Sequence, residues 1–97
     1  MSTSYQPKDS AVQGLQLKVQ ELVCNSSDSI VSSVGPVSTI DFKQPITEIR
    51  SVVFADNSAV TLTMIDSTKY VLSGNTLACT LPFALAANDS ITVKFVA

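Results

Sequence analysis

The chain has 97 residues and a formal net charge of −2, and it is 45% hydrophobic but only 14% charged. A single domain of this length buries a little over ~60% of its unfolded surface, and its charged share lies well below the usual ~25%. Six scattered Lys and Arg residues lack the clustering that phosphate binding requires, and no apolar run approaches the ~20 residues of a membrane span. We therefore expect neither nucleic acid nor a membrane as a partner.

The beginning of the chain is polar. Residues 1–11 contain no apolar core of a signal peptide, so we expect a flexible N-terminal arm on a protein that stays in the cytosol. The single folded domain is expected to occupy residues 12–97.

The first segment of that domain, residues 12–23, carries two patterns. Leu15, Leu17 and Val19 alternate with polar residues, as in a strand. Apolar residues also recur at helical spacing, after a Ser-x-x-Gln sequence that fits a capping box. Gly14 weakens the helix by about 1 kcal/mol, which favours the strand.

The middle of the chain becomes period two after a Ser-rich connection at residues 25–33. Ile40 and Phe42 alternate with polar residues, which is typical of a half-buried strand. The segment 46–54 differs because it is apolar on both faces. It is typical of a central strand, or of a strand that a second subunit covers.

The C-terminal half predicts further half-buried strands, in which alternate residues are apolar: Val60, Leu62 and Met64; Leu77, Cys79 and Leu81; Ile91, Val93 and Phe95. Gly74-Asn75 predicts a two-residue hairpin loop, because Gly and Asn tolerate positive φ. This loop pairs Leu72 with Leu77 and Tyr70 with Cys79, all on one buried face.

The pattern as a whole contains about seven strands and no secure helix. It predicts an all-β fold, a small antiparallel β-sandwich with immunoglobulin-like or related Greek-key topology. The Cys-Trp-Cys spacing of immunoglobulin domains is missing, because the chain has no Trp.

The sequence offers no chemistry that names a reaction. It has no His, no nucleophile motif, no glycine-rich phosphate loop and no calcium-loop spacing. We expect no enzyme, and no catalytic, cofactor-binding or metal-binding residue. Glu48 and Arg50 predict a surface ion pair, or an ion pair between subunits. Cys24 and Cys79 are expected to be two buried thiols, with a disulfide as the alternative.

Two segments, ITEIRSVVFADNSAVTLT at residues 46–63 and GNTLACTLPFALAANDSITVKFVA at residues 74–97, resemble small β-domains of tailed-bacteriophage structural proteins. The resemblance implies a virion component, usually oligomeric, bound to the major capsid protein or to the tail. It implies no site residue. The expected function is therefore that of a capsid decoration or cement protein, assembled in the host cytoplasm.

Two other functions remain open at this point: a tail or head–tail joining protein, and an immunoglobulin-like binding or adhesin module. A homo-oligomer, a trimer or a dimer, is expected because the surface is poor in charge and residues 46–54 are apolar on both faces.

Overall fold

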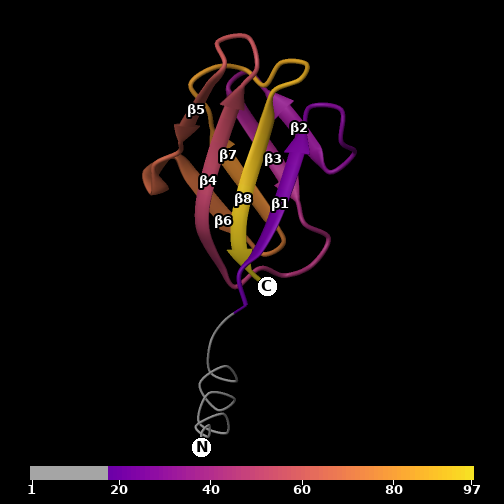
Figure 1. Ribbon diagram of the computed structural model, residues 1–97. Helices are drawn as coiled ribbons and strands as arrows, with labels where there is room; N and C mark the ends of the chain where they lie inside the picture. The colour runs from indigo at the N-terminus through magenta and orange to yellow at the C-terminus, as the bar shows by residue number, and fades with distance from the viewer. Residues whose placement is uncertain (1–17) are drawn as a thin grey trace, which may run out of the picture.

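The computed structural model describes residues 18–97 and shows an all-β protein in that part of the chain (Figure 1). The predicted arm, residues 1–11, and residues 12–17 lie outside the described residues. The strands are β1 (Gln20–Asn25), β2 (Val31–Val34), β3 (Val37–Asp41), β4 (Glu48–Asp56), β5 (Thr61–Met64), β6 (Tyr70–Ser73), β7 (Thr76–Thr80) and β8 (Ser90–Val96), with a 3-10 helix, η1 (Ser67–Lys69), before β6.

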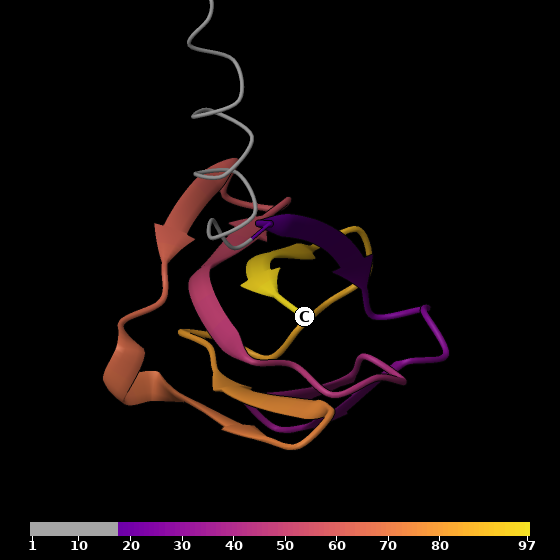
Figure 2. The same ribbon diagram turned by 90° about the horizontal axis from the view of Figure 1, so that it is seen from below.

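The strands form two antiparallel sheets of four, in the orders β1-β8-β4-β5 and β2-β3-β7-β6. Figure 2 shows the two sheets facing each other as layers. The predicted β-sandwich is confirmed, with eight strands in place of about seven. The first strand pairs with the last one, whereas the first strand of an immunoglobulin domain pairs with the second.

The two halves of the domain follow the same path. The chain runs from the outer strand β1 of the first sheet to the outer strand β2 and the inner strand β3 of the second sheet, and it returns to the inner strand β4 of the first. Strands β5, β6, β7 and β8 repeat this path in the same order. Gly35 and Gly74 turn the equivalent hairpins 39 positions apart, both with positive φ. The same offset relates buried positions: Ser38 and Leu77, Ile40 and Cys79, Ile46 and Leu85, Val52 and Ile91, Phe54 and Val93.

The core lies between the sheets and is built from alternate residues of each strand, because successive side chains point to opposite faces. The predicted inward residues of β3, β7 and β8 are buried, which confirms those strands: Ile40, Leu77, Cys79, Ile91, Val93 and Phe95. Leu81, just after β7, is also buried. The ring of Phe95 packs at 4.9 Å, centroid to centroid, from that of Phe42.

The hairpin between β6 and β7 has the predicted register. Leu72 lies opposite Leu77 and Tyr70 opposite Cys79. Gly74 has a positive φ of 63°, whereas the φ of Asn75 is not positive. A positive φ at the first loop residue alone is typical of a type II′ turn. The carbonyl of Gly74 accepts a hydrogen bond from the Ile46 N–H at 3.2 Å, so this hairpin also fixes the approach to β4.

Strand β4 is an inner strand, between β8 and β5, which confirms the central-strand interpretation of residues 46–54. Of residues 12–23, only 20–23 are found in a strand, β1, which confirms the strand interpretation there; Lys18 and Val19 precede β1, and residues 12–17 lie outside the described residues.

Two expectations about the sequence pattern were wrong. The Ser-rich connection contains part of a strand, β2, because Val31 pairs with Ile40 of β3. Strand β5 exists, but its apolar residues Leu62 and Met64 face solvent, and Val60 lies in the preceding turn with a φ of 55°. The pairing of Thr63 with the inward residue Phe54 decides this face, because residues directly opposite in a sheet share a face.

Candidate functional site

The described residues contain no group of three or more His, Cys, Asp or Glu side chains placed to hold a metal ion. Most of the aspartate carboxylates bond to the backbone of turns instead. Asp28, Asp41, Asp56 and Asp66 each accept a hydrogen bond from a nearby backbone N–H in an exposed turn. For Asp41 and Asp66, these backbone bonds hold the carboxyl pKa below its usual range.

Asp89 is the one aspartate that is buried in the described part of the chain, at 3% exposure. Its two carboxylate oxygens accept hydrogen bonds from the backbone N–H groups of Asn57, at 2.8 Å, and Ala86, at 2.9 Å. It therefore ties the β4–β5 turn to the β7–β8 connection. With both oxygens occupied by backbone donors, Asp89 has a structural role.

The predicted ion pair between Glu48 and Arg50 is present at 3.3 Å, and both side chains are about half exposed, at 46%. An exposed pair of this kind contributes under ~1 kcal/mol. It lies where the pairing of β4 with β8 shifts register.

The two cysteines are inward-facing and free, as expected. Burial, with a smaller effect of the Asp28 carboxylate, raises the pKa of the Cys24 thiol to about 11. Burial also raises the pKa of Cys79 to about 12, with Cys24 contributing. Because the thiolate is the nucleophilic form, both residues act as small core residues rather than as reactive groups.

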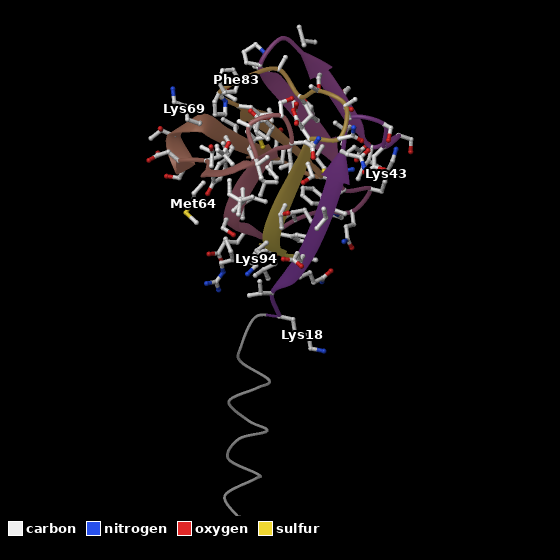
Figure 3. The ribbon with its side chains drawn as sticks, turned by 45° about the horizontal axis from the view of Figure 1, so that its top comes forward. Lys18, Lys43, Met64, Lys69, Phe83 and Lys94 are labelled. Atoms are coloured by element: carbon white, nitrogen blue, oxygen red, sulfur yellow. The ribbon has the colours of Figure 1, made fainter. Side chains whose placement is uncertain are left out.

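The cations of the described region do not gather. Figure 3 shows Lys18, Lys43, Lys69 and Lys94 projecting from different parts of the domain, and Lys43 is paired with Asp41 at 3.2 Å. This arrangement lacks the basic face that phosphate contacts require. Within residues 18–97, no helix has the length and apolar character needed to cross a membrane.

The most distinctive surface is the outer face of the β1-β8-β4-β5 sheet. Strand registers align two rows of side chains across all four strands, and neither row contains a charge: Val23, Thr92, Val53 and Met64 in one, Asn25, Ser90, Ala55 and Leu62 in the other. We call these eight residues the outer-face band. Charged side chains begin in the next row, where Glu21 lies opposite Lys94.

The exposed apolar groups of the band lie on the two outer strands. Val23 of β1 is 59% exposed, and Leu62 and Met64 of β5 are 76% and 72% exposed. Figure 3 shows Met64 projecting away from the rest of the domain. A surface depression of about 460 Å³ adjoins the band, between the β4–β5 turn and Asn88. Leu62 and Met64 lie side by side on β5, whereas Val23 lies across β8 and β4 from them, and apolar residues gathered on one sheet face mark interaction surfaces.

Sequence reasoning found these residues but assigned them to the wrong role. Leu62 and Met64 were expected to be the apolar residues of a half-buried strand, and no role was predicted for Phe83. Phe83 is 64% exposed, although the other three Phe side chains pack in or against the core. The sequence shows that Thr61–Met64 carries no charge, but it does not show which face of the sheet Leu62 and Met64 occupy.

No family model, no curated protein and no solved structure matches this chain.

Proposed function

We propose that the protein is a non-enzymatic structural protein that binds a larger protein assembly through the outer-face band. The assembly we propose is the virion of a tailed bacteriophage, with this chain as a decoration or cement protein on the shell of the major capsid protein. Placement in a virion rests on the resemblance of residues 46–63 and 74–97 to phage structural proteins. The observation that carries the binding role is the uncharged band with its exposed apolar side chains.

The size of the band favours a partner that binds many copies. Full burial of one exposed Val, Leu or Met side chain contributes about 1.5–3 kcal/mol. Val23, Leu62 and Met64 are 59%, 76% and 72% exposed, so together they contribute about 3–6 kcal/mol before costs. Association itself costs about 4–15 kcal/mol. One copy therefore binds weakly through the band, and linked copies on a repeating lattice gain from effective concentration. A homo-oligomer, a dimer or a trimer, on a capsid provides that arrangement.

Two alternatives place the same band elsewhere. A tail or head–tail joining protein would use it on a different part of the virion. A binding or adhesin module would use exposed aromatic side chains, and within residues 18–97 Phe83 is the one strongly exposed aromatic residue. A single ring gives less support to such a module than the band gives to a protein partner.

The test is to purify virus particles by density gradient from a lysate that contains the full chain, and to quantify the chain against the major capsid protein by mass spectrometry. We expect a fixed stoichiometry, and cryo-electron microscopy density for the sandwich on the capsid shell. Density on the tail would move the protein to the first alternative. A chain that stays entirely in the soluble fraction would overturn the virion proposal.

A matched pair of variants tests the band. Val23→Lys places a charge in the band, whereas Val34→Lys places the same charge on the outer strand β2 of the opposite sheet, where the valine is 83% exposed. We expect Val23→Lys to reduce incorporation into particles at least tenfold and Val34→Lys to leave it unchanged. Equal incorporation of both variants would show that the band is not the contact surface.

A further inference from the structure

Strand β5 is an unprotected sheet edge. It ends its sheet, and no strand of the described region pairs with it on the side away from β4. Proteins protect such edges with charges or proline, and the sequence Thr-Leu-Thr-Met has neither. The edge strand β1 carries Glu21, and β2 and β6 each expose one large apolar side chain, Val34 and Val71. Strand β5 exposes two, Leu62 and Met64.

The backbone of β5 is oriented for pairing on its open side. Just after the strand, Ile65 donates its N–H to the carbonyl of Val52 at 2.8 Å. Backbone groups of alternate residues in an antiparallel strand point to the same neighbour. Thr63 therefore directs its N–H and carbonyl towards β4, and Leu62 and Met64 direct theirs to the open edge.

We propose that this edge binds a second copy of the chain, through antiparallel pairing of β5 with β5 about a two-fold axis at Thr63. Leu62 of each copy then lies opposite Met64 of the other. Both residues direct their backbone groups to the edge, so the two pairs form four backbone hydrogen bonds. Their apolar side chains meet on the outer face. The product is one continuous sheet of eight strands, with the outer-face bands of both copies side by side.

The ends of β5 favour a copy as the occupant of this edge. Antiparallel pairing brings the start of one strand, next to Asp56, towards the end of the other strand, next to Lys69, so opposite charges meet at both ends. Figure 3 shows Lys69 and Met64 on the same side of the domain. Asp66 at that end accepts hydrogen bonds from Thr68 at 2.9 Å, and Asp56 likewise accepts them from Ser58 and Ala59 in its own turn, so Lys69 supplies the attraction at each end.

The area of this contact sets its strength. A stable interface buries about 800 Å² on each partner, which is more than one edge strand of four residues supplies. We therefore expect a weak dimer with a Kd of about 0.1 mM in solution, strengthened where a lattice holds copies together. The inference rests on the proposed function and deepens it, since a dimer places the outer-face bands of two copies side by side on one sheet face.

The experiment uses disulfide trapping in the full chain. In the proposed register Thr63 lies opposite Thr63 of the second copy in a pair whose Cα atoms are about 4.5 Å apart, within the range of a disulfide. Thr63→Cys is therefore expected to form a covalent dimer under mild oxidation at about 0.5 mM, above the expected Kd. Thr61→Cys is the matched control, because the Cα atoms of the two Thr61 residues are then about 14 Å apart. The native thiols are buried and free in the monomer, so the wild type controls for their reactivity.

Several results would decide the proposal. Met64→Lys in the Thr63→Cys background should reduce trapping at least tenfold, and Val71→Lys on β6 should not. Sedimentation equilibrium of the wild type should show a mass rising above 10.3 kDa with concentration. Trapping at Thr61 instead of Thr63, or a monomer at all concentrations, would overturn the proposed dimer. The dimer and the proposed function can fail independently of each other. We expect Val23→Lys to change incorporation into particles and to leave trapping at Thr63 intact, so its effect on incorporation tests the function and not the dimer.

Discussion

Replacing Asp89 with Ala removes the side chain that joins two loops at one end of the sandwich. The carboxylate is buried and accepts backbone N–H groups from Asn57 and Ala86 at 2.8 and 2.9 Å. A hydrogen bond to a charged group contributes about 1.5–3 kcal/mol. Both donors belong to exposed residues and regain water in the variant, so the low end applies to each. We expect Asp89→Ala to lower the free energy of unfolding by about 3 kcal/mol.

Urea denaturation followed by circular dichroism measures this change. With a slope of about 1.5 kcal/mol per M, a loss of 3 kcal/mol lowers the midpoint by about 2 M. Asp89→Asn keeps one acceptor oxygen and should lose about half as much. Asp56→Ala removes an exposed carboxylate that also accepts two backbone N–H groups, and it should cost under about 1 kcal/mol. If Asp89→Ala and Asp56→Ala have equal effects, burial is not what makes the Asp89 contacts strong.

Gly74→Ala should lower the free energy of unfolding by about 1 kcal/mol, because φ at Gly74 is 63° and side chains other than glycine are strained there, although nothing lies within 4 Å of an added Cβ. Gly74→Asn should cost less, because Asn tolerates positive φ. A Gly74→Ala variant that is more stable in urea would contradict the turn. Burial raises the pKa values of Cys24 and Cys79 to about 11 and 12, above the ~8.5 of an unfolded thiol. Their contribution to stability is therefore complete below about pH 8.5 and is lost as the pH rises through these values. The free energy of unfolding should fall from pH 9 to pH 11, and fall less in Cys24→Ala/Cys79→Ala; equal slopes would refute this assignment.

Local sequence signals were sufficient for much of the architecture. The alternation around Ile40, Leu77 and Ile91 predicted strands whose apolar residues are buried, because a period of two matches the pleat of a strand. Gly74 predicted the register of its hairpin because a two-residue loop leaves one pairing of the flanking residues. The aspartates of the exposed turns follow an equally local rule, because their short side chains bond to nearby backbone N–H groups.

The internal repeat was not visible in the sequence. Gly35 and Gly74 are among the few identities at an offset of 39 positions, and buried positions are filled by different residues, such as Ser38 and Leu77. A core accepts many apolar residues of suitable volume at one position. Equivalent positions therefore keep their burial while their residue types differ.

The sequence by itself determined that the chain forms strands, where its central strand lies and how the second hairpin turns. Only the tertiary structure decided which side of β5 is covered. The alternation in Thr61–Met64 predicts that the two faces of the strand differ in polarity. The apolar face is buried only if pairing with the neighbouring strand turns it towards the core. Pairing with β4 sets Thr63 on the inner face beside Phe54 and leaves Leu62 and Met64 outside. The outer-face band therefore depends on that pairing, since register is a property of two strands and not of one.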